Sequence, residues 1–282
     1  MNQTELRGKV AIVTGAAAPR GLGRVMTQEL VKAGARVSMV DINECWLDDA
    51  AAHMRSIGGP DCVMTQLVDV TSYDEVERSI ENTIKTLGGL HVLVNNAGIA
   101  PKNMFLGVDT GSRAWELSPE EFARGIAVNT SGSFHMLKGA IPVMLAQNWG
   151  RVIGVTTSFG TMCRAGGAPY GPSKAAHEAL IAMVSSELEG TGVTANVLVP
   201  GGLTSTNMVP DDATFERETM IQPDVMGAPV VWLASEESNN FNGQRIVAYH
   251  WDEDLPQEER LAKASAPAAW PQLEGQPVFV NK

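Results

Sequence analysis

Short apolar runs alternate with longer stretches of helical periodicity through most of this chain. The run from Lys9 to Thr14 is almost wholly apolar and predicts a strand that is buried on both faces. Similar runs predict further strands at 36–40, 62–68, 90–94, 151–157, 193–199 and 244–249. Because parallel strands need crossover helices, the alternation predicts a doubly wound α/β domain. We expect a parallel sheet of about seven strands with helices on both faces.

Capping residues mark where several helices begin. Ser72 and Glu75 form a capping-box pattern, and Ser118, Pro119 and Glu121 combine a cap, a proline and a glutamate. The sequence therefore predicts helices over residues 72–87, 118–148 and 172–188. Residues 1–249 form one predicted domain, whereas residues 250–282 are rich in Pro, Glu and Ala and predict an extension outside the sheet.

Charge and cysteine usage exclude several classes of protein. The chain has 21 basic and 32 acidic residues and a net charge of −11, which argues against binding to nucleic acid or an anionic membrane. Its three cysteines and five histidines lack the spacing of a disulfide framework or a metal site. The N-terminus has no apolar segment, and no apolar run reaches the ~20 residues that span a bilayer. We expect a soluble cytoplasmic protein.

Glycine is abundant, with 28 residues in 282, and three glycines follow the first predicted strand. Gly15, Gly21 and Gly23 lie before a predicted helix. Glycines let the backbone approach a pyrophosphate, and the helix N-terminus supplies N–H groups and a positive dipole end. The pattern indicates a dinucleotide site, with a purely structural tight turn as the alternative.

Asp41 ends the second predicted strand about 20 residues further on. A carboxylate there accepts hydrogen bonds from the adenosine ribose and repels a 2′-phosphate, which favours NAD over NADP. A turn-capping aspartate is the alternative. Arg20 argues for NADP, because an arginine in the glycine loop could pair with a 2′-phosphate.

Other motifs complete a family resemblance: Asp69–Val70, Asn95–Gly98, Asn129, Thr157–Ser158, Tyr170–Lys174 and Pro200–Gly201. In their joint order and spacing, these residues resemble the short single-domain branch of the short-chain dehydrogenase/reductase family. The resemblance covers about residues 5–249 and implies a single-domain Rossmann-like fold. It also implies an NAD-dependent oxidoreductase that interconverts a secondary alcohol and its ketone by hydride transfer.

Tyr170 and Lys174 are four residues apart at the start of a predicted helix, so they share one face. A phenol with a pKa near 10 is a poor acid or base at neutral pH. A nearby ammonium and an oxidised nicotinamide would both lower that pKa. The resemblance implies that Tyr170 transfers the proton, that Lys174 also holds the nicotinamide ribose, and that Asn129 organises a water for proton relay.

The sequence departs from the family pattern at two places. The position of the family's catalytic serine holds Thr157, next to Ser158, and only one of two neighbours on a strand faces the site. We favour Thr157, which keeps the hydroxyl. Five residues separate Gly15 from Gly21, as in the enoyl-reductase branch, so an imine or C=C reductase stays an alternative. The four-residue step from Tyr170 to Lys174 favours carbonyl and alcohol chemistry.

The resemblance also implies cofactor contacts beyond the glycine loop. Asp69 and Val70 match the pair beside the adenine, and Asn95 has the alternative role of stabilising the sheet. Thr204 and Thr206 are both candidates for the family's threonine that holds the pyrophosphate. The expected cofactor-binding residues are Gly15, Arg20, Gly21, Leu22, Gly23, Asp41, Asp69, Val70, Asn96, Ala97, Gly98, Tyr170, Lys174, Pro200, Gly201, Leu203 and Thr204.

Substrate contacts are expected from an insertion near residues 101–115 and a lid near residues 207–222. The candidates are Met104, Phe105, Met162, Arg164 and Met208. Methionine suits an adaptable apolar pocket, although an ordinary core role is the alternative for each. Arg164 would meet an anionic substrate group or lie solvated at the surface.

The family resemblance further implies a homodimer or homotetramer that pairs the helices beginning near Pro119 and Pro172. The tail, with Trp251 and Trp270, would cap the pocket, reach a neighbouring subunit or form a flexible appendage. Two rival functions stay open. One is an NADP-dependent reductase on the same fold, and the other is a non-catalytic dinucleotide-binding regulator or scaffold.

Overall fold

The computed structural model describes residues 5–105 and 111–273. In this part of the chain, eight strands form one sheet in the order β3-β2-β1-β4-β5-β6-β7-β8. The first seven strands are parallel, and β8 is antiparallel to β7. The strands are β1 (Val10–Thr14), β2 (Arg36–Asp41), β3 (Val63–Leu67), β4 (Val92–Asn95), β5 (Gly150–Val155), β6 (Val193–Val199), β7 (Gln244–Val247) and β8 (Ser265–Pro267). The expected parallel α/β fold is confirmed.

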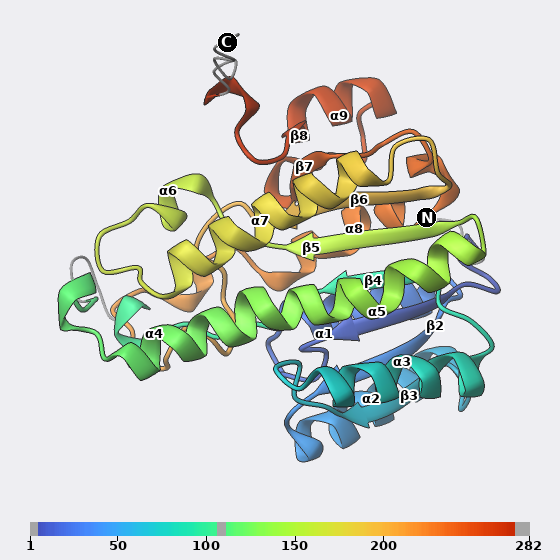
Figure 1. The fold of residues 1–282 in the computed structure, drawn as a ribbon, viewed down its shortest axis with the longest axis horizontal. Coiled ribbons are helices and arrows are strands. Elements are labelled where there is room, and N and C mark those ends of the chain that lie inside the picture. The colour runs from blue at the N-terminus through green and yellow to red at the C-terminus, as the bar shows by residue number, and fades with distance from the viewer. Residues whose placement is uncertain (1–4, 106–110, 274–282) are drawn as a thin grey trace, which may run out of the picture.

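Helices cover both faces of the sheet (Figure 1). The α-helices of the described residues are α1 (Leu22–Lys32), α2 (Glu44–Gly58), α3 (Tyr73–Leu87), α4 (Pro119–Ile126), α5 (Gly132–Ala146), α6 (Phe159–Met162), α7 (Tyr170–Glu187), α8 (Gly227–Ala234) and α9 (Gln257–Ala264). Residues on α1, α2 and α8 share one hydrophobic core with the sheet, and residues on α3, α5 and α7 share the other.

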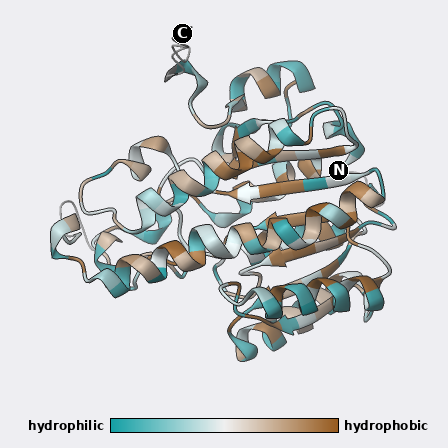
Figure 2. Cartoon of the chain, in the orientation of Figure 1, coloured by the Kyte–Doolittle hydropathy of each residue, from teal (hydrophilic) through white to brown (hydrophobic). Residues whose placement is uncertain are grey.

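The strands divide their side chains between these two cores. On β1, Ala11 and Val13 belong to the core with α1, whereas Ile12 belongs to the core with α5 and α7. This follows from the alternation of side chains along a strand. Figure 2 shows apolar strands enclosed between helices that carry more polar residues. The buried apolar runs therefore fix the sheet, and its strand order places the ends of β1 and β4 side by side.

The predicted capping box at the start of α4 is present, whereas the one predicted at the start of α3 is wrong. Glu121 N–H donates to the Ser118 hydroxyl at 3.1 Å, and Ser118 N–H donates to the Glu121 carboxylate at 3.2 Å. At α3, no bond to the Ser72 side chain caps the helix within the described residues. The Glu75 carboxylate instead accepts from Asp69 N–H at 2.9 Å, so it orders the turn before the helix.

The sequence predicted that the extension after residue 249 lies outside the sheet. This prediction is wrong for part of the extension. After α9, β8 pairs with β7 and aligns Ser265 with Ile246 and Ala266 with Arg245. An edge strand leaves a row of backbone groups unpaired, and β8 bonds with them. With three residues, β8 is too short to show an alternating pattern in the sequence. Within residues 5–105 and 111–273, every helix is too short or too polar to cross a lipid bilayer.

Candidate active site

The loop between β1 and α1 is shaped by close backbone contacts. Gly15 has a φ of +63°, a conformation that favours glycine. A Cβ on Gly23 would lie only 2.2 Å from the Gly15 carbonyl oxygen. Gly21 precedes α1, whose first turn receives no capping side chain from the described residues. The N–H groups of that turn therefore suit the phosphates of a dinucleotide.

Asn96 and Thr14 tie this loop to the end of β4. The Asn96 side-chain amide donates to the carbonyl oxygens of Thr14 at 2.8 Å and Gly15 at 3.1 Å. The Thr14 hydroxyl accepts from the N–H groups of Asn96 and Ala97, both at 2.9 Å. Asn95 instead donates to the Ser133 carbonyl at 2.9 Å, which holds α5 on the sheet and matches its structural alternative.

Asp41 ends β2, Asp69 follows the end of β3, and both order the next turns. One Asp41 carboxylate oxygen accepts from Ala17 N–H in the glycine loop at 3.0 Å, and the other accepts from Ile42 N–H at 2.8 Å. Asp41 is half-buried, so its carboxylate is fixed beside the loop and caps the turn as well. Asp69 accepts from the N–H and hydroxyl of Thr71 at 2.9 and 2.8 Å.

Arg20 is held by the predicted lid. Its guanidinium pairs with Asp211 at 2.8 Å, and its N–H donates to the Asn207 side chain at 2.7 Å. Arg217 pairs with the same Asp211 at 2.8 Å. Hydrogen bonds from Arg20 and then Arg217 hold the pKa of Asp211 below its usual value. The segment 207–222 therefore lies against the glycine loop, and the Arg20 charge is engaged there.

Tyr170 is the first residue of α7, two residues earlier than the predicted helix start, and Lys174 follows one turn later. Both side chains are buried. Burial raises the pKa of Tyr170 to about 12, although a hydrogen bond with the Thr157 side chain opposes the rise. Burial lowers the pKa of Lys174 to about 8, and its ammonium donates to the Val155 carbonyl at 2.8 Å. The expected lowering of the Tyr170 pKa is reversed in the protein alone, because desolvation dominates.

The structure distinguishes the two candidate hydroxyls. Ser158 caps α6, since its hydroxyl accepts from Thr161 N–H at 3.2 Å and lies 2.8 Å from the Thr161 hydroxyl. The Thr157 side chain, in contrast, lowers the pKa of Tyr170. Ser158 is therefore engaged as a helix cap, and Thr157 stays the preferred hydroxyl.

Asn129 lies in a π-helical turn, Ala127–Ser131, which interrupts the long helix predicted over 118–148. Its buried amide donates to the Ser173 hydroxyl at 2.8 Å and to the Ile99 carbonyl at 2.9 Å. A Cβ on Gly98 would lie 3.1 Å from the Asn129 Oδ1 and 3.2 Å from the Lys174 ammonium. Asn129, Gly98 and Lys174 therefore meet at one point, and π-helical turns are frequent at functional sites.

The segment after β6 forms a tight turn. Gly201 has a φ of +114°, and Pro200 accepts from Tyr249 N–H at 3.0 Å. The Thr204 hydroxyl donates to the Gly202 carbonyl at 3.0 Å, and the Thr206 hydroxyl accepts from Met208 N–H at 3.3 Å. Both threonines are engaged locally, so the geometry does not separate them.

The expected substrate residues have different surroundings. Met104 and Met162 are buried and Met208 is half-buried, while the side chain of Phe105 and residues 106–110 lie outside the described part. Arg164 donates to the Met104 carbonyl, so it joins the predicted insertion to the loop before Tyr170. Arg164 is exposed, and contact with an anionic substrate group stays a prediction.

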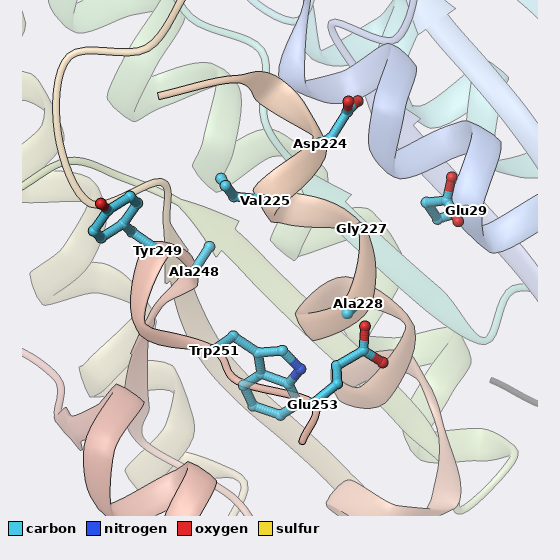
Figure 3. A pocket seen from close by; sticks show the side chains of 9 residues that line it. All are labelled: Glu29, Asp224, Val225, Gly227, Ala228, Ala248, Tyr249, Trp251 and Glu253. Atoms are coloured by element: carbon cyan, nitrogen blue, oxygen red, sulfur yellow. The ribbon is translucent and has the colours of Figure 1, made fainter. Parts of the chain in front are cut away.

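Three residues near the site were missed in the sequence: Phe159, Glu178 and Arg245. Phe159 packs on Trp270 of the tail, with ring centroids 5.2 Å apart, and Glu178 and Arg245 form an ion pair beneath Thr157. The signal for Glu178 was its place four residues after Lys174 on the same helix face. A separate hollow of about 440 Å³ is lined by residues from α1, the segment before α8 and the turn after β7 (Figure 3). None of the described residues expected to bind cofactor or substrate lines it.

Comparison with known proteins agrees with this geometry. Residues 9–217 match the family model described as short chain dehydrogenase. The chain is 31% identical over 246 residues to a 2,5-dichloro-2,5-cyclohexadiene-1,4-diol dehydrogenase of Sphingobium indicum, covering 84% of this chain and 93% of that protein. It is 28% identical over 252 residues to a 3-oxoacyl-[acyl-carrier-protein] reductase of Thermotoga maritima, covering 86% and 96%.

A solved structure from Burkholderia xenovorans, described as a short-chain dehydrogenase/reductase, superposes with a TM-score of 0.77 at 28% identity. The superposition covers 86% of this chain and 96% of that one. Family match, relatives and site geometry lead to one conclusion. The chain belongs to the short-chain dehydrogenase/reductase family and is an NAD(P)-dependent oxidoreductase that acts on CH–OH groups.

Proposed function

We propose that this protein is an NAD-dependent dehydrogenase that interconverts a secondary alcohol and its ketone. The observation that carries the proposal is the pair of buried side chains of Tyr170 and Lys174, one helical turn apart on α7. The Thr157 side chain acts on the same phenol by lowering its pKa. A hydroxyl, a phenol and an ammonium held together suit a reaction in which a proton leaves or reaches a substrate oxygen.

Each group has a distinct role in this proposal. Tyr170 exchanges a proton between its phenol oxygen and the substrate oxygen, and Thr157 donates a hydrogen bond that orients that oxygen. Lys174, one helical turn along α7, would supply positive charge toward the phenol and hold the nicotinamide ribose. Asn129 fixes the backbone at Ile99 and positions the water of the proton relay. When bound, the nicotinamide ring supplies the hydride acceptor or donor.

The adenosine end favours NAD. The Asp41 carboxylate is fixed beside the glycine loop, where it would accept the ribose hydroxyls and repel a 2′-phosphate. Arg20 could offset that repulsion, but its guanidinium pairs with Asp211 of the lid. We therefore expect Asp41→Asn to lower the ratio of NADH affinity to NADPH affinity by about tenfold. This change corresponds to the loss of one modest hydrogen bond to the ribose and of the repulsion of a 2′-phosphate.

Fluorescence titration of both reduced cofactors against wild type and Asp41→Asn measures this preference. Ser158→Ala is the control, because Ser158 caps α6 away from the adenosine end. Tighter binding of NADPH than NADH to the wild-type protein would favour the NADP-dependent reductase instead.

An apolar substrate fits the surroundings of the site. The loop after Thr157 carries Phe159 and Met162, and Trp270 packs on Phe159. The relative from Sphingobium indicum is described as acting on a chlorinated cyclohexadiene diol, which supports cyclic alcohols as first choices. A panel of cyclic and open-chain secondary alcohols and ketones, followed by NADH absorbance, tests the substrate class.

Tyr170→Phe is the decisive variant for the reaction. It should bind NADH like the wild type, because only the hydroxyl is lost, and turnover should fall by about 100-fold or more. Tyr249→Phe is the matched control, since it removes the hydroxyl of an exposed tyrosine. Retained turnover in Tyr170→Phe would contradict the assignment. NADH binding by a wild type that turns over no alcohol or ketone would favour a regulator or scaffold.

We also propose a homodimer or homotetramer. Phe122 of α4, Phe134 of α5 and Met183 of α7 are exposed, at 41%, 49% and 51%. Apolar side chains exposed on neighbouring helices are typical of an interface between copies of one chain. Light scattering of the purified protein tests this, and a monomer at micromolar concentration would contradict it.

A further inference from the structure

A charged group lies unusually deep beneath the candidate site. Glu178 lies on α7, one turn after Lys174, and is 0% exposed. One carboxylate oxygen accepts from the Thr156 hydroxyl at 2.7 Å, and the other accepts from Ala269 N–H at 3.4 Å. Burying an ionised carboxylate is costly unless it is paired and hydrogen-bonded, so its position requires a partner.

Arg245 of β7 is that partner, and it does more than neutralise Glu178. One arm of its guanidinium pairs with the Glu178 carboxylate. The other arm donates to the Thr157 carbonyl at 2.7 Å. The planar guanidinium fixes the angle between two acceptors, whereas a lysine ammonium does not. The ion pair therefore holds the peptide group of the residue whose side chain meets Tyr170.

These contacts tie Thr157 to α7. The Thr157 carbonyl accepts from Arg245, and Arg245 pairs with Glu178 on α7. The Thr157 side chain in turn lowers the pKa of Tyr170 at the start of the same helix. Tyr170, Lys174 and Glu178 are spaced four residues apart and share one helix face. The helix that carries the phenol thus also anchors the residue that presents a hydroxyl to it.

We propose that Arg245 and Glu178 are positioning residues that hold Thr157 against Tyr170 for the reaction. The inference rests on the proposed alcohol–ketone chemistry. Thr157 lies just beyond the end of β5, where strand bonds no longer fix its backbone, so the Arg245 bond supplies the missing constraint. Misplacing a catalytic group by about 1 Å is enough to lower a rate by about 100-fold.

The C-terminal segment encloses this pair. β8 aligns Ala266 with Arg245, and Ala269 supplies the N–H that reaches Glu178. The Arg245 side chain is only 13% exposed, so water has little access to the ion pair of Arg245 and Glu178. The extension after α9 therefore belongs to the support of the site.

Arg245→Lys tests the inference most directly. Lysine keeps a positive charge for Glu178 but lacks the two-armed geometry that also reaches Thr157. For the alcohol or ketone that the wild type turns over fastest in the panel, kcat should fall about tenfold or more. The affinity for NADH should stay unchanged. The pH profile of kcat should move to higher pH, because the Thr157 hydrogen bond favours the ionised phenol.

Arg151→Lys is the matched control. Arg151 is a buried arginine at the opposite end of β5, where it donates to the carbonyl oxygens of Ser235 at 3.1 Å and Gly150 at 2.8 Å. Its replacement should lower thermal stability about as much as Arg245→Lys does. It should leave kcat and its pH profile unchanged, since neither contact approaches Tyr170.

A double variant separates positioning from folding. Glu178→Gln combined with Arg245→Met removes both charges, which often restores the stability that is lost when one buried partner is left alone. Positioning predicts that kcat stays low in this folded protein. Recovery of kcat together with stability, or wild-type kcat and pH profile in Arg245→Lys, would overturn the inference. A wild type that is inactive across the panel would overturn the proposed function itself, and this inference with it.

Discussion

Burial acts in opposite directions on the two ionisable groups of the site. It raises the pKa of Tyr170 from 10.0 to about 12 and lowers the pKa of Lys174 from 10.5 to about 8. For Lys174, the unfolded chain binds more protons than the folded chain between about pH 8 and 10.5, so the free energy of unfolding rises with pH there. For Tyr170, the folded chain keeps its proton longer, so stability falls between about pH 10 and 12.

Lys174→Met should remove the first of these effects. From pH 8 to pH 10, the free energy of unfolding of the wild type should rise relative to that of the variant by roughly 2 kcal/mol. Urea unfolding at unit steps from pH 7 to pH 10 measures the difference. Lys32→Met is the control, because Lys32 is partly exposed on α1. A difference between wild type and Lys174→Met that does not change with pH would contradict the buried ammonium.

Single residues of the site were predictable where a motif specifies them. The spacing of Tyr170 and Lys174 was enough to place both groups at the start of α7. The choice of Thr157 over Ser158 as the catalytic hydroxyl stays a prediction. The ion pair between Glu178 and Arg245 was not predictable, although Glu178 shares a helix face with Lys174. The two residues are 67 positions apart in the sequence. A single charged residue on a predicted strand or helix indicates a solvent-exposed face, and only the folded structure shows that it is buried with a partner.

At the scale of elements, the junction of β1 and α1 depends on how closely two backbone segments approach. A methyl group on Gly23 would lie 2.2 Å from the Gly15 carbonyl oxygen and 2.7 Å from the Asn96 amide nitrogen. Neither atom is the end of a flexible side chain free to move, because Asn96 is bonded to Thr14 and Gly15. The glycine therefore sets the distance between helix and loop.

Gly23→Ala should push α1 away from the glycine loop. We expect NADH to bind at least about tenfold more weakly, which corresponds to an overpacking cost of roughly 1–3 kcal/mol. Fluorescence titration measures the affinity, and thermal unfolding measures the accompanying loss of stability. Gly160→Ala is the matched control, since a Cβ there meets no atom within 4 Å. Equal NADH affinity in both variants would contradict the close approach.

Elements were predictable where the apolar pattern is regular and less so at their interruptions. The seven parallel strands follow from buried runs, and Ser118 and Glu121 marked the start of α4 correctly. The π-helical turn at Ala127–Ser131 was not predictable, because one extra residue in a turn leaves the apolar periodicity of a long helix almost unchanged. That turn carries Asn129, so the local irregularity lies at the site.

At the scale of the whole molecule, the two ends of the sheet differ. β3 forms one edge, whereas β7 is covered by β8, a strand from the C-terminal extension. The same extension contacts the site twice, through Ala269 at Glu178 and through Trp270 at Phe159. Of the three roles expected for the tail, contact with the pocket region is the one that these interactions support. One segment therefore both covers the β7 edge of the sheet and contacts residues of the site.

Truncation after Ala264 removes β8 and both of these contacts. It should lower the melting temperature by several degrees, because β7 loses its pairing with β8 and Glu178 loses a hydrogen bond. In a domain of this size, a loss of about 1 kcal/mol in the free energy of unfolding shifts Tm by roughly 2–4 °C. It should also lower kcat more than NADH affinity, since the glycine loop lies elsewhere. Trp270→Ala keeps β8 and separates the aromatic contact from the strand. If the truncated protein kept wild-type kcat, the extension would be a cover for the sheet edge alone, and the coupling of β8 to Thr157 through Arg245 would be contradicted.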